Sequence, residues 1–285
     1  MLQFDSPREI KAKEKELYKP IEKVQLSTLL SKHSFPSGNE YAIIDSDKNI
    51  LNFCSEVYSP KLNYEIFPQV EQGLTAAGIE FRKKIKIIGN AKFYVDYIIM
   101  ERMKTISVND VFPKLSIWNS YDGVIKFRKE FGFYKLICSN GLCRPTEKHS
   151  SVSFKHTKNN NISIGNEIEK IAKDFIVDSK NDMKIFDRMN HKPATDKTVL
   201  QLAEETGLSL HVKQAALDRF KLETSGKLQY LNEHNETVIS NGVPKTMFAV
   251  YNALNWAINN CNPKELPEKK IEKDRQVLEL VTELA

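Results

Sequence analysis

The chain has 285 residues, of which 41% are apolar and 28% are charged, proportions typical of a soluble globular protein. No apolar run approaches the ~20 residues that a membrane-spanning helix needs, and residues 1–10 show no signal-peptide core. The cysteines are few and scattered, which argues against a disulfide framework. These features argue against membrane, secreted and disulfide-rich classes, and we expect a cytoplasmic protein.

We predict an N-terminal arm over residues 1–39, which is rich in Lys and Glu, and then a hairpin over residues 41–54. Asp45, Asp47 and Asn49 lie between the two apolar runs of that hairpin, and Asp and Asn favour turns. Their spacing is also that of the start of a calcium loop, but Ile50 stands where such a loop needs glycine. We interpret the segment as a turn.

A helix is predicted over residues 68–78, because apolar side chains recur there at helical spacing and proline suits a first turn. Strands are then predicted in close succession, the first two joined by a Gly89-Asn90 turn. They comprise residues 82–88, 92–100, 111–118, 124–129, 131–138 and 151–156. Alternation places Ile125 and Phe127 toward the core and Lys126 and Arg128 outward.

From residue 165 onward the spacing of apolar residues is helical. Helices are predicted around residues 168–189, 196–207, 211–222, 244–260 and 271–284. The fold class is thus α+β: an antiparallel β-meander with a short helix before it and a helical half after it. We divide the chain into the arm (1–39), a sheet domain with a basic face (40–160) and a helical region packing on the sheet (161–285).

Positive charge is concentrated in residues 81–158, which hold sixteen Lys and Arg against six Asp and Glu, whereas the whole chain has a net charge of +5. Cations that contact phosphates and aromatic rings that stack on bases are the groups that single-stranded nucleic acid requires. The alternative is a solubilising surface, since edge strands often carry Lys. Tyr121, at a predicted turn tip, is expected to be exposed. The predicted nucleic-acid-binding residues are Arg82, Lys84, Lys92, Tyr94, Tyr121, Lys126, Arg128, Lys135, Arg144 and Lys148.

Catalytic and metal sites are weakly indicated. A metal-dependent nuclease would need clustered carboxylates, and the candidates are Asp96, Asp122 and Glu130 with Lys148, although Asp122 also suits a turn before Gly123. His149 and His156 lack a nucleophile partner. Four residues separate Cys138 from Cys143, which is loose for a zinc site. No phosphate-binding loop or dinucleotide fingerprint is present. We therefore predict no catalytic residue, metal or cofactor.

Short motifs carry a family resemblance. They are the hairpin at residues 43–53, N-S-x-D-G at 119–123, C-S-N-G-L at 138–142 and S-F-K-H-T at 153–157. Over residues 40–260 the chain resembles a phage- and plasmid-encoded family of uncharacterised function, domain-of-unknown-function family nine-three-two. The resemblance implies a mobile-element origin in a bacterial host and supplies no catalytic residues.

The order of elements, a helix, a basic meander and a long helix, also resembles that of single-strand annealing proteins of recombination. That resemblance is architectural, and it implies assembly into a homo-oligomer on DNA. We therefore expect a mobile-element protein that binds single-stranded DNA in recombination or annealing. The alternative is a structural or interaction protein of a phage or plasmid without nucleic-acid affinity.

Overall fold

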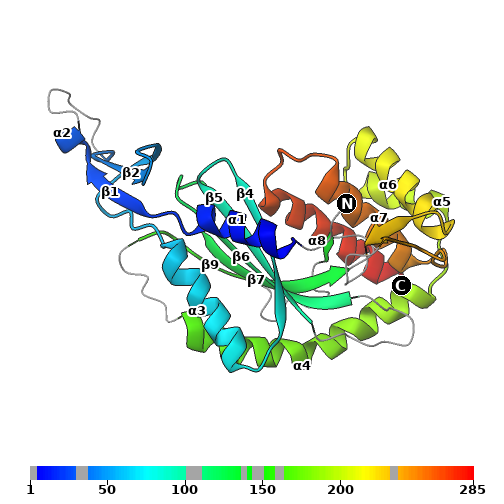
Figure 1. Cartoon of the computed structure of the whole chain (residues 1–285). Helices are drawn as coiled ribbons and strands as arrows, with labels where there is room; N and C mark the ends of the chain where they lie inside the picture. The colour runs from blue at the N-terminus through cyan, green and yellow to red at the C-terminus, as the bar shows by residue number, and fades with distance from the viewer. Residues whose placement is uncertain are drawn as a thin grey trace.

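The computed structural model describes residues 5–29, 38–100, 111–135, 140–142, 151–157, 164–231 and 237–285 (Figure 1). The helices are α1 (Pro7–Leu17), α2 (Leu26–Leu29), α3 (Asn63–Ala76), α4 (Ile164–His191), α5 (Asp196–Glu205), α6 (Leu210–Thr224), α7 (Met247–Asn260) and α8 (Pro267–Leu284). The strands are β1 (Ile21–Gln25), β2 (Tyr41–Asp45), β3 (Ile50–Cys54), β4 (Phe81–Ile88), β5 (Lys92–Ile99), β6 (Val111–Ser120), β7 (Phe127–Lys135), β8 (Asn140–Leu142), β9 (Ser151–Phe154), β10 (Gln229–Leu231) and β11 (Thr237–Ile239).

The largest sheet has the order β4-β5-β6-β7-β8, with β9 pairing with another part of β7, and every pairing is antiparallel. The predicted α+β class and meander are thereby confirmed. Alternate side chains of β4–β7 enter one hydrophobic core together with α3 and α4. Phe131 of β7, for example, lies 4.8 Å from Phe175 of α4 between ring centroids. Helices α3 and α4 run along the lower side of the sheet in Figure 1.

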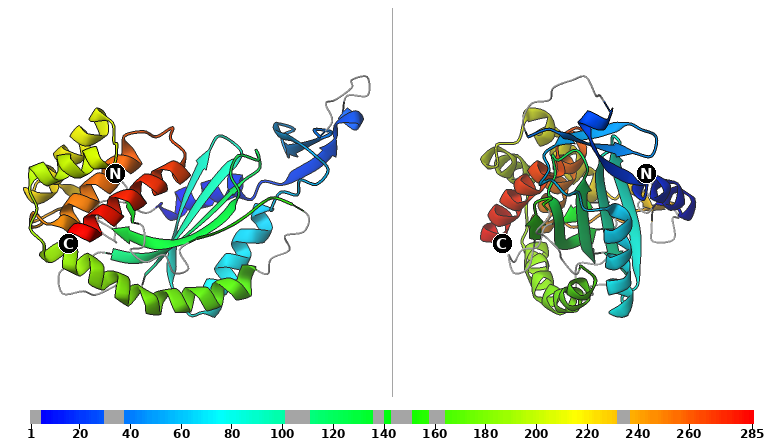
Figure 2. Two further views of the ribbon diagram at one scale, coloured as in Figure 1. Left: turned by 180° about the vertical axis from the view of Figure 1, so that it is seen from behind. Right: turned by 90° about the vertical axis from the view of Figure 1, so that its left-hand side faces the viewer.

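The helical half shares this core. Phe186 of α4 is fully buried, with its ring 5.6 Å from Phe133 of the sheet and 5.4 Å from Phe248 of α7. The same buried cluster includes residues from α1 and from each of the helices α3 to α8. Figure 2 shows α5–α8 gathered at one end of the sheet. The sheet and the helices are therefore held together by continuous apolar packing.

Strands β1, β2 and β3 form a second antiparallel sheet that stands out from the body (Figures 1 and 2). The predicted turn between β2 and β3 is confirmed. One carboxylate oxygen of Asp45 accepts hydrogen bonds from the backbone N–H groups of Asp47 (2.9 Å) and Asn49 (2.8 Å). Lys19 at the base of this sheet lies 3.0 Å from the other Asp45 oxygen. The carboxylate that suggested a calcium ligand is thus satisfied within the chain.

Several element boundaries differ from the predicted ones, and two of the differences have a clear cause. Helix α3 begins at Asn63 and has Pro68 inside it, because the buried Tyr121 hydroxyl accepts the N–H of Asn63 and fixes an earlier start. The strands predicted over residues 124–129 and 131–138 are replaced by the single strand β7, Phe127–Lys135. Gly132 pairs with Lys114 of β6 within that strand rather than ending it.

Gly242 is predicted to tolerate no side chain. Its φ is +80°, and an added Cβ would lie 3.0 Å from both the Gly226 nitrogen and the Thr224 carbonyl oxygen. Gly207 has a similar φ of +63°, but open space surrounds it. Both alanine variants acquire about 1–2 kcal/mol of backbone strain, and Gly242→Ala adds about 1–3 kcal/mol of overpacking. Chemical denaturation should show the larger loss for Gly242→Ala; equal losses would contradict the close approach.

Candidate nucleic-acid interface

The face of the large sheet opposite α3 and α4 carries polar side chains between two buried apolar clusters, one of Ile98, Phe112 and Tyr134 and the other around Tyr94 and Trp118. The strand register arranges its side chains in transverse rows: Lys84 pairs with Asp96, Asp96 with Ser116, and Ser116 with Glu130. The adjacent rows place cations beside this one. We call this surface the polar sheet face; it consists of Arg82, Lys84 and Lys86 of β4, Lys92, Tyr94, Asp96 and Ile98 of β5, Lys114, Ser116 and Trp118 of β6, and Arg128 and Glu130 of β7.

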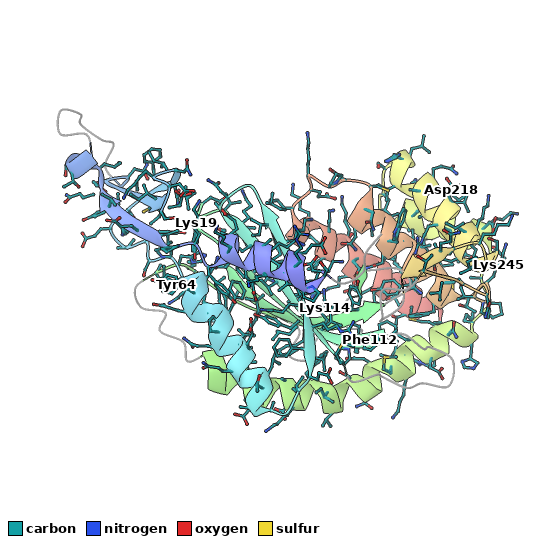
Figure 3. The ribbon with its side chains drawn as sticks, in the orientation of Figure 1. Lys19, Tyr64, Phe112, Lys114, Asp218 and Lys245 are labelled. Atoms are coloured by element: carbon teal, nitrogen blue, oxygen red, sulfur yellow. The ribbon has the colours of Figure 1, made fainter. Side chains whose placement is uncertain are left out.

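The central row is electrostatically linked. The Ser116 hydroxyl donates a 2.6 Å hydrogen bond to Asp96, and the Lys114 ammonium lies 3.6 Å from the same carboxylate oxygen. Lys84 lies 5.4 Å above the Tyr134 ring centroid. Burial lowers the pKa of Lys84, while the charge of Asp96 acts in the opposite direction. The Lys84 ammonium is thus partly desolvated, and a bound anion would stabilise its charged form. Figure 3 shows Lys114 at the centre of the molecule, between α1 and the helical end.

Helix α8 covers the neighbouring part of the face. Ile271 of α8 packs on the buried pair Tyr94 and Trp118. The Arg128 guanidinium lies 4.9 Å from the Trp118 ring centroid and 3.2 Å from Glu130. Burial raises the pKa of Glu130, and the nearby Arg128 charge partly offsets that effect. This end of the face is therefore a packed, charge-compensated layer rather than an open surface.

Arg82, Lys84 and Arg128 lie on the polar sheet face, and the outward position of Arg128 is the one that the alternation predicted. Lys126 is exposed just before β7, and Lys92 forms an ion pair with Asp122 at the end of β5. The described residues include the backbone of Lys135 but not Arg144 and Lys148, so these side chains cannot be placed on the face. The assignment of all these residues to nucleic-acid binding stays a prediction.

The two predicted stacking tyrosines are not surface groups. Tyr121 has only 1% of its surface exposed, so its expected exposure at a turn tip is wrong. Its hydroxyl accepts the Asn63 N–H at 2.8 Å, and its ring packs edge-on against Phe93 with centroids 5.1 Å apart. Tyr94 is buried against Trp118. Base stacking in this structure would require these rings to move, so contact with phosphates is the more direct mode of binding.

The predicted site residues omitted three cations of this region, Lys86, Lys114 and Lys270. Lys86 of β4 is exposed and lies two residues after Lys84, on the same face of the strand as Arg82 and Lys84. The alternation of the strand was therefore sufficient to predict its position. Lys270 of α8 is buried, and both burial and the neighbouring Lys86 lower its pKa. Only the tertiary packing of α8 brings Lys270 here, so no local pattern could indicate it. The Lys270 ammonium donates a 2.7 Å hydrogen bond to the Asn259 carbonyl, and it lies close enough to Lys86 for that charge to lower its pKa.

The catalytic candidates are not assembled. Asp96 and Glu130 share a row but are separated by Ser116, and Asp122 binds Lys92 elsewhere. Within the ranges that the structure describes, no three His, Cys, Asp or Glu side chains are grouped so that they could hold a metal ion. Cys138, Cys143 and His149 lie outside those ranges.

His156 has a structural position. It is buried, its Nδ1 accepts the Lys61 N–H at 3.4 Å, and its Nε2 donates to the Ile125 carbonyl at 3.0 Å. Both ring nitrogens are therefore satisfied by the neutral imidazole, and burial lowers the pKa of His156. This arrangement provides no reactive group.

A pH dependence follows from the lowered pKa of His156. The unfolded chain, with an ordinary His pKa of about 6.5, binds a proton more readily than the folded chain. The contribution to stability is therefore complete above that pKa and decreases as the pH falls toward the folded-state value. The variant His156→Gln keeps a donor and an acceptor but does not titrate. Between pH 7.5 and 5, the unfolding free energy of the natural chain should fall more steeply; parallel curves would contradict this.

These features define an α+β protein in which one face of an antiparallel sheet is apolar and packed and the other is polar and rich in cations. The profile of the family described as "Domain of unknown function (DUF932)" matches residues 51–278. The chain belongs to this family, as the short motifs indicated. No curated protein and no solved structure matches the chain significantly. None of the helices in the described ranges is long and apolar enough to cross a membrane.

Proposed function

We propose that the protein binds single-stranded DNA through the polar sheet face and acts in recombination or annealing for a mobile element. The observation that carries the proposal is the row of cations along β4. Arg82, Lys84 and Lys86 alternate on one face, so their Cα atoms are spaced by about 6.6–6.8 Å. A linear series of cations is suited to a linear series of phosphates.

The electrostatics of this row support an anionic ligand. Lys84 and Lys270 both have lowered pKa values, with burial as the main cause in each. Asp96 and Asp5 raise the pKa of Lys84, while Lys114 and Lys13 lower it; Lys86 lowers the pKa of Lys270, and Glu265 raises it. Holding desolvated like charges together costs stability. A bound phosphate chain would offset that cost, and shifted pKa values of this kind cluster at functional sites.

The neighbouring helices favour a single strand over a duplex. Lys13 of α1 lowers the pKa of Lys84, and Lys86, the next outward residue of β4, lowers that of Lys270 of α8. Cations of both helices therefore lie near the cation row of β4. A single row of cations with helices close to it suits one backbone, whereas a duplex needs a broader, groove-sized contact.

The proposal is tested by measuring binding of labelled single- and double-stranded oligonucleotides across a salt series, with an annealing assay in parallel. We expect tighter binding of the single strand, an affinity that falls steeply with salt, and faster annealing. Binding of both DNA forms with equal affinity would contradict the single-strand preference. No binding at low salt would reject the proposal and favour the alternative, a structural or interaction protein of the mobile element.

A further inference from the structure

One carboxylate of the N-terminal arm lies at the outer edge of the cation row on β4. Asp5 immediately precedes Ser6, the N-cap of α1, and one of its oxygens accepts the backbone N–H of Ile85 at 2.9 Å. Its other oxygen lies 2.6 Å from the Lys13 ammonium. The Asp5 charge also raises the pKa of Lys84. This carboxylate is therefore bound by a backbone N–H and one ammonium group, and it acts on a second ammonium group.

The groups that bind Asp5 are those that bind a phosphate. Backbone N–H groups at the edge of a sheet form anion sites, and ammonium groups strengthen hydrogen bonds to carboxylate and phosphate oxygens alike. The position lies beside Lys84, in the middle of the row that Arg82, Lys84 and Lys86 form. A DNA backbone that follows this row passes next to Asp5.

The balance of charge around Lys84 changes when Asp5 is withdrawn. The charges that act on the pKa of Lys84 include the ammonium groups of Lys13 and Lys114 and the carboxylates of Asp96 and Asp5. Counting Lys84 itself, three positive charges stand against two negative ones, and against only one without Asp5. The vacated position therefore attracts an anion more strongly than the occupied one.

The N-terminal half of α1 is weakly attached to the body. Of residues 7–13, Ile10 packs on the hydrophobic core and is half-buried, whereas Pro7 and Ala12 are exposed. The buried apolar anchor of the helix, Leu17, is in its last turn. Helix α1 lies alongside β4 (Figure 1). Its first turns can therefore leave β4 with little loss of apolar burial while the last turn stays in the core.

We propose that the backbone N–H of Ile85, together with Lys84 and Lys13, forms a binding site for one phosphate of the DNA strand, and that Asp5 occupies this site in the free protein. The site belongs to the polar sheet face, so its role depends on the proposed function. Asp5 competes at the effective concentration of an intramolecular ligand, which a dilute DNA strand must overcome. A strand that binds displaces the first turns of α1 and gains the contacts that Asp5 gives up.

The variant Asp5→Asn tests the competition. It keeps an oxygen acceptor for the Ile85 N–H but loses the negative charge, so a labelled oligothymidylate should bind about threefold to tenfold more tightly at low salt. The matched control Glu16→Gln removes the same charge from the same helix, but Glu16 is 43% exposed at its side chain and lies 3.9 Å from Lys19 rather than against β4. The control should bind like the natural chain. Fluorescence anisotropy measures all three affinities, and thermal unfolding checks that both variants are folded.

Hydrogen exchange followed by mass spectrometry tests the displacement itself. In the natural chain, the backbone amides of residues 9–13 should exchange faster once the oligothymidylate is bound, because the first turns of α1 have left β4. Unchanged or slower exchange there would overturn the displacement, since the arm would then stay in place or join the DNA-binding surface.

The affinities separate failure of the site from failure of the proposed function. Equal affinities for the natural chain and Asp5→Asn, or weaker binding by Asp5→Asn, would overturn the phosphate site and leave the proposed DNA binding intact. An equal gain in Asp5→Asn and Glu16→Gln would also overturn the site, because it would be a general effect of net charge. If none of the three proteins binds the oligothymidylate at low salt, the proposed function is rejected and this site with it.

Discussion

The double variant Arg82→Ala/Lys86→Ala is expected to bind single-stranded DNA about tenfold to hundredfold more weakly at low salt. Both side chains lie on the outward parity of β4, and neither is in the apolar core. If each contacts one phosphate, the slope of log affinity against log salt should decrease in magnitude by about 1.4, since each contact with a single strand contributes about 0.7. Fluorescence anisotropy at several salt concentrations measures both quantities.

The matched control removes two exposed lysines at the helical end, Lys184 and Lys197, which leaves the same net charge as the test variant. If the long-range field of the protein alone attracted DNA, both variants would lose affinity equally. If the cations of β4 contact the phosphates, the control should retain nearly all of its affinity for DNA and the original slope of log affinity against log salt. Equal losses, or an unchanged slope in the test variant, would move the binding surface away from the polar sheet face.

The choice of Arg82 and Lys86 depends on the structure, because alternation in the sequence placed Lys126 and Arg128 outward and would have suggested replacing that pair. Lys126 is exposed and suits such a test. Arg128 instead contacts Trp118 and Glu130 beneath α8. Replacing Arg128 disturbs a packed layer. A loss of DNA binding in a variant that replaces both Lys126 and Arg128 would therefore not distinguish a lost phosphate contact from a misfolded sheet.

Local signals were sufficient for much of the fold. The hairpin of β4 and β5 was predictable because Gly89-Asn90 marks a two-residue turn between strands of period two. The same alternation predicted the outward position of Arg128, which the register of β7 bears out. The helices after residue 164 followed from apolar spacing alone. These elements are specified by their own residues, so tertiary contacts did not need to be known.

The remaining features depend on contacts between distant segments. Tyr121 lies in a polar turn sequence, yet it is buried because α3 supplies the N–H of Asn63 to its hydroxyl. Trp118 and Tyr94 are covered by α8, more than 140 residues later in the chain. No pattern within the sheet segment can show that a distant helix will cover one part of its polar face. The candidate site was therefore predictable in its strands and parity but not in its accessible area.

The largest expected effect on stability is that of Arg128→Ala, about 3–5 kcal/mol at neutral pH, the usual cost of removing one partner of a buried ion pair. Glu130 is 9% exposed at its side chain and lies 3.2 Å from Arg128, whereas Arg275 of α8 is farther away, at 3.8 Å. Without Arg128, the Glu130 carboxylate has lost its closest cation in a layer covered by α8. Urea denaturation of the purified variant measures the loss.

The pH dependence of that loss separates two roles of Arg128. Burial already raises the pKa of Glu130 above its ordinary value, and Arg128 opposes this. Because the pKa of Glu130 is raised in the folded chain, the folded chain binds this proton more readily than the unfolded chain does. The unfolding free energy therefore falls as the pH rises above the ordinary Glu pKa of about 4.3. It levels off once the pH exceeds the folded-state pKa. Removing Arg128 raises that value further. The cost of Arg128→Ala should therefore be smallest near pH 4 and grow toward pH 7.

The variant Glu130→Gln provides the control, because it removes the charge but keeps the shape of the side chain. In that background Arg128→Ala should cost much less, and its cost should not vary with pH. The remaining cost measures the stacking of the guanidinium on Trp118, about 0.5–2 kcal/mol for such a contact. If Arg128→Ala cost the same at every pH with Glu130 present, the arginine would stabilise the sheet through Trp118 alone, and the layer beneath α8 would tolerate an unpaired carboxylate.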